Sequence, residues 1–346
     1  MGEKLVKNFT TMNTLTKITV IIIAAMTLFS CKNTKTAAET EPCKAAIPTF
    51  SADSAYIYCQ QQCLFGPRAM NTAEHDRCRD WIAAEFRRHG CEVTLQECML
   101  KAFDGTMLRS TNIIASYTPK NFSEEMPRIM LCAHYDTRPW ADNDPEEKNH
   151  HSPILGANDG ASGIAVMLEI ARILNAADSA KTAVEFVCFD AEDYGTPSWY
   201  KGEEQLENPW ALGSKYWAER YIADEKRKEI SYGILLDMVG GIGAKFYHEG
   251  MSLVHAKSIV QKVWSAASEA GYSTFFPSRS GGYVTDDHIA VNEIAQIPCV
   301  DIIAHYPDCE QSSFGMTWHT VNDNMENISK ETLEAVGQTL TYLIYK

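Results

Sequence analysis

Long apolar runs without alternation are the feature that most limits what this chain can fold into. RIMLCA at 128–133 and FVCF at 186–189 are continuous apolar segments. Strands of this kind are buried on both faces, which happens in sheets that carry helices on both sides. The sequence therefore predicts an α/β sandwich, with a central twisted mixed β-sheet flanked by helices on both faces.

Helical patterns separate these runs. Residues 71–90 begin with the cap candidates Asn71 and Thr72 and end on Gly90, which suits the position just after a helix. We expect further helices at 160–174, 214–223, 253–270 and from 329 to the end, and strands at 92–97, 111–117, 128–133, 183–190, 232–238 and 298–304. No repeat or second composition shift interrupts this order, so 48–346 is predicted to be a single α/β domain.

The N-terminus has a different composition. ITVIIIAAMTLF at 18–29 is uncharged, follows Lys17 and is short for a bilayer span, as is typical of a secretory signal. Leu28-Phe29-Ser30-Cys31 resembles the bacterial lipoprotein signal, in which the cysteine is lipidated; an ordinary cleaved signal with an incidental cysteine is the alternative. We therefore expect a lipoprotein-type signal peptide at 1–30, a flexible tether at 31–47, and an exported protein. A lipid at Cys31 would anchor it in the bacterial envelope, facing the periplasm.

Overall charge narrows the class of partners. The chain is 45% hydrophobic and 22% charged, as in soluble globular proteins, and its formal net charge is −14. This charge argues against a nucleic-acid partner and against a basic membrane-binding surface, so any membrane attachment is expected through Cys31. Eleven cysteines in an exported chain are compatible with disulfides and lack zinc-finger spacing.

Acidic and histidine side chains stand where the predicted strands end. In open α/β sheets, functional groups gather at the carboxyl ends of the strands. The strand ends and the loops LGANDGASG, TDDHIAV and GMTWHTVND bring a set of such residues to one edge: His134, Asp159, Glu192, Asp193, Asp237, Asp286 and His319. Taken singly, each has an ordinary explanation, such as a helix cap for Asp159, a turn for Asp237 or a core histidine for His134 and His319.

Taken together, these side chains indicate a metal site. Several carboxylates at one edge repel each other unless a cation neutralises them. Histidine nitrogen mixed with carboxylate oxygen, without a cysteine cluster, suits zinc. Asp159, Asp193 and His319 would fill three zinc positions and leave one open. Glu192, beside a ligand but not itself one, is then a candidate general acid/base.

The ordered motifs HYD, GANDGASG, the acidic pair after FD, LLD and WHT-x-x-D resemble the zinc aminopeptidase superfamily and, within it, bacterial glutaminyl cyclases. The resemblance covers roughly residues 65–345. TDDHIAV, WHTVNDN and three aromatic residues placed as in the cyclase pocket favour the cyclase: Trp199, Phe314 and Trp318. One departure is that animal cyclases have two glutamates where this chain has Glu192 and then Asp193.

The resemblance implies a reaction and roles. An N-terminal glutamine of a peptide or protein would be cyclised to pyroglutamate with release of ammonia, using one zinc ion per chain. Glu192 would move the proton from the α-amine to the leaving nitrogen, with Asp286 and Asp237 completing its hydrogen-bond network. Trp199, Phe314 and Trp318 would form the substrate walls.

Two rival functions stay open at the level of sequence. The first is an aminopeptidase with two zinc ions, in which His134 and Asp237 hold the second ion and Asp159 bridges. The chain retains all three residues. The second is an anchored binding protein whose fold has lost its chemistry.

A loop near the predicted site carries three further polar residues. Asp142, Asn143 and Asp144 suit either a solvated loop or a calcium-binding loop.

Overall fold

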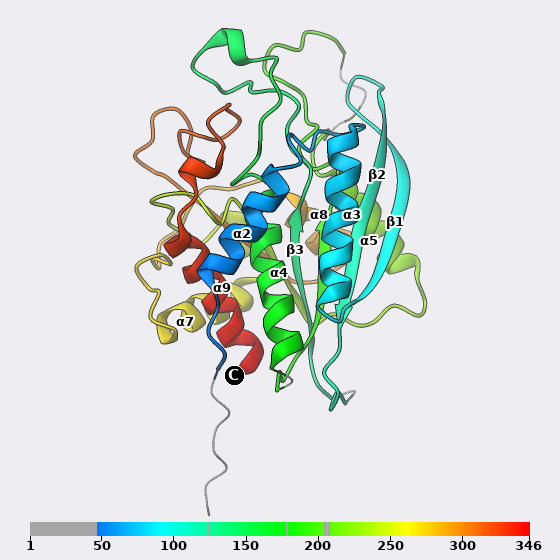
Figure 1. Ribbon diagram of the computed structural model, residues 1–346, viewed down its shortest axis with the longest axis vertical. Helices are drawn as coiled ribbons and strands as arrows, with labels where there is room; N and C mark the ends of the chain where they lie inside the picture. The colour runs from blue at the N-terminus through cyan, green and yellow to red at the C-terminus, as the bar shows by residue number, and fades with distance from the viewer. Residues whose placement is uncertain (1–46, 124, 178, 204–205, 207) are drawn as a thin grey trace, which may run out of the picture. The chain divides into compact units, whose positions relative to one another are not determined.

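Six strands form one mixed sheet at the centre of the protein (Figure 1). The computed structural model describes residues 47–346 except 124, 178, 204, 205 and 207. The spatial order is β1-β2-β4-β3-β5-β6, and the strands are β1 (Glu92–Lys101), β2 (Met107–Tyr117), β3 (Arg128–His134), β4 (Ala183–Phe189), β5 (Tyr232–Asp237) and β6 (Cys299–Ile303). β1, β2 and β4 pair antiparallel, whereas β4, β3, β5 and β6 run parallel.

Burial along the strands explains their sequences. Every residue of β3, β5 and β6 is buried, which accounts for the continuous apolar runs in the parallel half of the sheet. β1 lies at the sheet edge and has no buried residue, so its sequence is more polar. The β1–β2 hairpin extends beyond the expected strand limits because Gly105, with φ of 87°, closes a tight turn between them.

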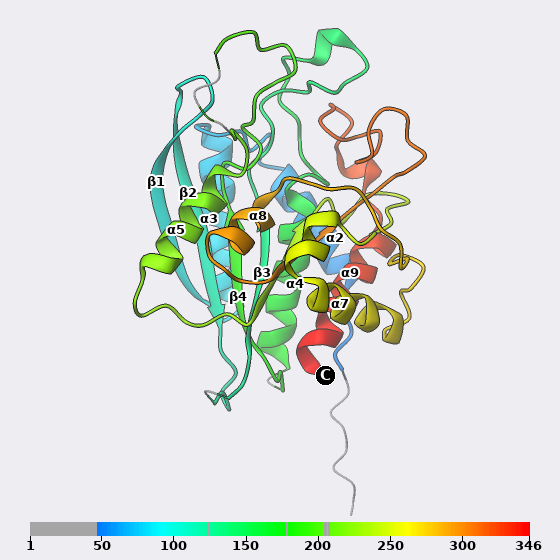
Figure 2. The same ribbon diagram turned by 180° about the vertical axis from the view of Figure 1, so that it is seen from behind.

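Helices cover both faces of the sheet. One face carries α2 (Ala52–Cys63), α3 (Ala73–Arg88), α4 (Ala161–Ala176), α7 (Lys257–Glu269) and α9 (Lys330–Tyr345). The opposite face carries α5 (Leu212–Ala223) and α8 (Asp287–Glu293), as Figure 2 shows. Three shorter elements complete the order: η1 (Glu147–Asn149), α6 (Gly250–His255) and η2 (Met325–Asn327). The predicted α/β sandwich is confirmed.

Local sequence signals set several helix ends. The Thr72 side chain accepts the N–H of His75 and caps α3, which ends just before Gly90 at φ of 76°. The single helix expected at 253–270 is wrong: α6 and α7 are separate because Ala256 leaves the helical region (φ −135°, ψ 34°). α6 begins earlier than expected because the Glu249 carboxylate caps its first turn.

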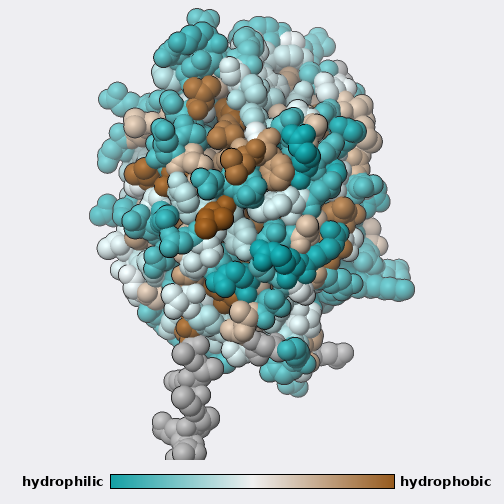
Figure 3. Space-filling view, viewed as in Figure 1, coloured by the Kyte–Doolittle hydropathy of each residue, from teal (hydrophilic) through white to brown (hydrophobic). Residues whose placement is uncertain are grey.

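Several of the sequence-based predictions concern the N-terminus. The predicted signal peptide 1–30, Cys31 and residues 31–46 of the tether lie outside the described residues. Within the part that the structure describes, no helix is long and apolar enough to cross a membrane. The cysteines of the described residues are all free thiols, so no disulfide forms among them. The face seen in Figure 1 is mostly polar with separate apolar patches (Figure 3).

Candidate active site

The backbone takes left-handed turns where the sheet delivers its polar side chains. Ala191, Met238 and His319 have φ values of 54°, 50° and 53°. Ala191 immediately precedes Glu192, and Met238 immediately follows Asp237 at the end of β5. Non-glycine residues in this region are strained, and such strain is concentrated at functional sites.

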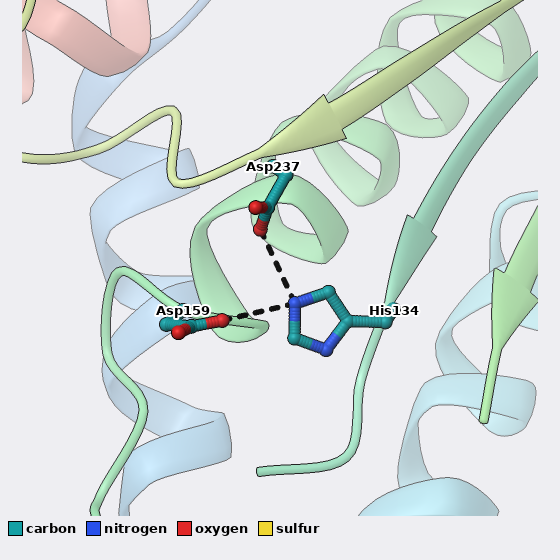
Figure 4. A group of neighbouring side chains, drawn as sticks. All are labelled: His134, Asp159 and Asp237. Carbon is teal, nitrogen blue, oxygen red and sulfur yellow. Dashed lines mark hydrogen bonds and ion pairs between the residues drawn. The ribbon is translucent and has the colours of Figure 1, made fainter. Parts of the chain in front are cut away.

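Three side chains from separate elements converge at the carboxyl ends of β3 and β5 (Figure 4). Nε2 of His134 lies 3.1 Å from Oδ1 of Asp159 and 3.2 Å from Oδ1 of Asp237. Asp159 does not cap the following helix, since α4 begins after Gly160 without a side-chain cap. Its carboxylate is therefore available to the site.

A second set shares Asp159. Nε2 of His319 lies 3.6 Å from Oδ2 of Asp159 and 3.2 Å from Oδ1 of Asp193, and one ligand atom from each residue lies within 4.8 Å of the others. The His319 ring stacks on Trp318, with ring centroids 3.8 Å apart, and on Trp210 at 6.0 Å. Asp159 thus turns one oxygen toward each of two histidines.

The donor set of Asp159, Asp193 and His319 fits zinc. Both carboxylate oxygens of Asp193 are buried, and among the described residues the nearest side-chain donor to them is Nε2 of His319, at 3.2 Å from Oδ1. Burial, together with repulsion from Asp159, raises the pKa of Asp193. A cation removes both penalties because it neutralises the buried charge and offsets the repulsion. Two carboxylates and one imidazole match zinc ligands and leave one position open.

Two carboxylates that are not ligands hold the ligand loops in place. Asp136 accepts the N–H groups of Glu192 and Asp193, each at 3.1 Å. Asp323 accepts the N–H of Asn158 at 2.7 Å and that of Asp159 at 3.0 Å. Each carboxylate fixes two consecutive N–H groups, which orients the side chains that follow.

A buried ion pair supports the same ligands from the other side. Nε and Nη2 of Arg138 lie 2.6 and 2.7 Å from the two oxygens of Asp142, and Nη1 donates to the carbonyl oxygen of Asp193 at 3.1 Å. Oδ1 of Asp142 lies 3.6 Å from Nδ1 of His319. The Arg138 guanidinium also lies over the Trp210 ring, with its Cζ 4.7 Å from the ring centroid. The Asp142 side chain is thus buried in an ion pair and is not solvated.

Glu192 lies at the same cavity as the expected ligands Asp159 and Asp193. It lines a cavity of about 160 Å³ together with Asp237 and Asp286. Burial, followed by repulsion from Asp286 and Asp193, raises the pKa of Glu192 well above its usual value, although His134 opposes the shift. Burial and the Asp237 carboxylate raise the pKa of Asp286 to about 7. Among the described residues, no hydrogen bond joins Glu192 to either aspartate.

Aromatic side chains wall this cavity. Phe314 and Trp318 line it, and their rings lie 5.0 Å apart. Trp199 does not: it packs against His151 at 4.4 Å and Trp140 at 6.2 Å in a separate aromatic group. The second indole at the cavity wall, beside that of Trp318, belongs to Trp210.

Sequence reasoning missed the supporting residues more than the ligands. Asp136 and Asp323 belong to the HYD and WHT-x-x-D motifs, so their positions were a usable signal. Arg138 and Asp142 are four residues apart in HYDTRPWAD, but this stretch is a loop, where that spacing predicts no contact.

A family profile and two curated enzymes are similar in sequence to this chain. The sequence profile of peptidase family M28 matches residues 112–344. The curated aminopeptidase YwaD of Bacillus subtilis is 33% identical over 74% of this chain, which spans 47% of that protein. The bovine glutaminyl-peptide cyclotransferase is 23% identical over 68% of this chain and 65% of its own length. The chain thus spans about half to two thirds of these curated relatives.

Solved structures match over nearly their full length. A glutaminyl cyclase of Bacteroides thetaiotaomicron, bound to N-acetylhistamine, is 48% identical with a TM-score of 0.81, over 87% of this chain and 99% of its own. A leucine aminopeptidase precursor from the same organism is also 48% identical, with a TM-score of 0.80 and the same coverage. The glutaminyl cyclase of Tannerella forsythia is 46% identical, with a TM-score of 0.81, over 86% and 99%. The profile match and these relatives together show that the chain belongs to peptidase family M28, a family of zinc enzymes.

Proposed function

We propose that this protein cyclises the N-terminal glutamine of peptides and proteins to pyroglutamate and releases ammonia. The observation that carries the proposal is the position of Glu192. Its carboxyl group lines a small aromatic cavity beside the Asp159, Asp193 and His319 ligand set, and its pKa is raised well above the usual value. A cavity of about 160 Å³ is small compared with sites for drug-sized ligands, which favours a single residue as its occupant.

The residues of the cavity suit intramolecular attack of the α-amine on the γ-carboxamide. Asp159, Asp193 and His319 would hold a zinc ion, which would supply polarisation of the carboxamide. Glu192 takes a proton from the α-amine and passes it to the departing nitrogen. A carboxyl group with a raised pKa exchanges protons closer to neutral pH than an ordinary glutamate does, which suits this double role.

The surrounding groups assist without forming bonds to the substrate. Asp286 and Asp237 face the same cavity, and repulsion from Asp286 makes proton uptake by Glu192 more favourable. Phe314, Trp318 and Trp210 exclude water and hold the glutamine side chain folded toward its own amine. Because nucleophile and electrophile belong to one residue, correct positioning supplies much of the rate.

A zinc aminopeptidase is the second candidate function. The observation in its favour is the set of His134, Asp159 and Asp237, whose ligand atoms also lie within 4.8 Å of one another and would hold a second ion. We favour one ion per chain, as in the glutaminyl cyclases that the sequence motifs resemble.

Location follows from the N-terminal sequence. We propose that the protein is exported and anchored in the bacterial envelope by a lipid at Cys31, facing the periplasm, and that it meets glutamine-led peptides there. The apolar run at 18–29 and the Ser30-Cys31 step support this. Neither a nucleic-acid partner nor a basic membrane surface is part of the proposal, given the net charge of −14.

Ammonia release tests the proposed function. A glutamine-led peptide should release ammonia, whereas the same peptide led by asparagine should not. N-acetylhistamine, the ligand of the Bacteroides thetaiotaomicron cyclase, should inhibit competitively. No ammonia from the glutamine-led peptide, with metal-loaded protein, contradicts the proposal.

A further inference from the structure

Two further hollows continue from the catalytic cavity across the surface. The cavity shares Val284, Ile303 and Phe314 with a small hollow of about 50 Å³. That hollow shares Tyr247 and His305 with a groove of about 800 Å³. The three hollows therefore adjoin one another in a row that begins at Glu192.

The outer groove lies between two segments that are already held in place. Its walls come from residues 241–247, after β5, and 305–317, after β6 (orange in Figure 1). The N–H of His305 donates to the carbonyl oxygen of Lys245 at 2.9 Å, and Oη of Tyr306 donates to that of Ile242 at 3.2 Å. These bonds join the two walls, so the groove is preformed.

We propose that this groove binds the residues that follow the N-terminal glutamine, and that it favours an apolar and then a basic side chain at the third and fourth positions. This inference rests on the proposed function. The catalytic cavity holds about 160 Å³, so a longer peptide must leave it, and the small hollow beyond Phe314 lies between the cavity and the groove. The groove volume of about 800 Å³ lies within the range of ligand sites.

The side chains along the groove determine which peptides fit. Ile242 and Met316 are 58% and 72% exposed, so each wall offers apolar surface to a substrate side chain. Asp308 and Glu310 are exposed at the groove, and within the described residues neither has an ion-pair partner. Lys245, the cation of the opposite wall, lies over the Phe275 ring at 4.8 Å. Two carboxylates without partners favour a basic substrate side chain.

Peptide kinetics on the metal-loaded protein test this inference. The substrates are the amides of Gln-Ala, Gln-Ala-Leu-Lys and Gln-Ala-Leu-Glu, measured at roughly 0.15 M salt so that distant charges are screened. We expect kcat/KM to be about fivefold higher for the lysine peptide than for the glutamate peptide, with the difference in KM, as exposed ion pairs allow. The kcat/KM of the lysine peptide should also be higher than that of the dipeptide.

Matched double variants separate the groove from the charge of the whole molecule. Asp308→Asn with Glu310→Gln should bring the lysine-to-glutamate ratio to within about twofold of one. Glu92→Gln with Glu97→Gln removes two exposed carboxylates from β1, at the opposite edge of the sheet, and should keep the wild-type ratio. The inference is overturned if the wild-type ratio is one, or if both double variants lower it equally.

The same assay distinguishes failure of the groove from failure of the function. Equal kcat/KM for the dipeptide and for both tetrapeptides contradicts the groove alone, because cyclisation itself then proceeds. Absence of ammonia release from all three peptides contradicts the proposed function, and the inference that rests on it fails as well.

Discussion

Arg138 and Asp142 form a buried two-point ion pair, with nitrogen–oxygen distances of 2.6 and 2.7 Å. Asp142 faces Nδ1 of His319, and Arg138 donates to the carbonyl oxygen of Asp193. The ion pair therefore supports two of the three expected zinc ligands, one through a side chain and one through the backbone. Carboxylate support behind a ligating histidine orients the ring and raises its basicity.

Replacing Asp142 should weaken metal binding. In Asp142→Asn, the ion pair with Arg138 is lost, and a buried guanidinium remains beside His319 and Asp193. We expect zinc affinity to fall roughly 10- to 100-fold, measured by competition with a chromophoric chelator. Asp80→Asn, at an exposed ion pair on α3, is the control and should bind zinc as the wild type does. An affinity for Asp142→Asn within about twofold of the wild type contradicts the supporting role.

Replacing Glu192 should separate turnover from metal binding. Glu192→Gln keeps the shape of the side chain and removes the group that carries the proton. We expect kcat to fall roughly 10²- to 10⁴-fold with zinc content unchanged. Asp193→Asn should instead lose zinc and activity together, because Asp193 belongs to the ligand set. Full activity in Glu192→Gln would show that the proton is moved by another group.

A side chain at Gly160 should destabilise the protein. Its φ is 100°, and a Cβ there would lie 2.7 Å from the carbonyl oxygen of Asp136 and 3.2 Å from Cε1 of His134. Gly271 has a similar φ of 94° with nothing within 4 Å, so Gly271→Ala isolates the backbone strain. We expect both alanine variants to lose about 1–3 kcal/mol of unfolding free energy in urea, with Gly160→Ala losing more. Equal losses would show that the contact with Asp136 relaxes freely.

Glu249 should stabilise the loop that leads to Asp286 in a pH-dependent way. Its carboxylate accepts the N–H groups of Ser252 and Val284 and lies 3.2 Å from Nε2 of His288. Burial alone would raise the pKa of Glu249, but His288 and the N–H donors lower it to about 2. Because the folded value lies below the unfolded value of about 4.3, this stabilisation is complete above that pH and is lost as the pH falls to about 2.

Unfolding of Glu249→Gln tests that pH dependence. At pH of about 7 the variant should be less stable than the wild type by about 1–3 kcal/mol, measured by urea unfolding. The difference should shrink below pH of about 4, because Glu249 of the unfolded wild-type chain takes up a proton there while the folded carboxylate stays ionised. A difference that is unchanged between pH of about 7 and about 3 would mean that the ionised carboxylate is not its source.

The parallel half of the fold was predictable from sequence because burial on both faces leaves a continuous apolar run, as in β3. The grouping of Asp159, Asp193 and His319 was also accessible, since each follows a strand end or precedes a helix. The break between α6 and α7 at Ala256 was not predictable from sequence. The apolar pattern of 253–270 continues through this residue, and only the backbone angles reveal two helices.

Loop side chains limited the prediction of the cavity. Trp199 and Trp210 both lie between β4 and α5, where no periodicity tells which indole turns inward. Trp210 does so because it stacks on His319 and lies beneath Arg138, and a Cβ on Gly195 would meet its ring at 2.2 Å. These contacts join three loops that are distant in sequence, so local sequence patterns do not predict them.

The mass of the peptide product tests the central claim most directly. The metal-loaded protein is incubated with an equal mixture of a glutamine-led and a leucine-led peptide of otherwise identical sequence, and the products are read by mass spectrometry. The account predicts that the glutamine peptide loses the mass of one ammonia and keeps all its residues, while the leucine peptide stays intact. Loss of a whole N-terminal residue from either peptide, without loss of ammonia, would contradict it and establish an aminopeptidase.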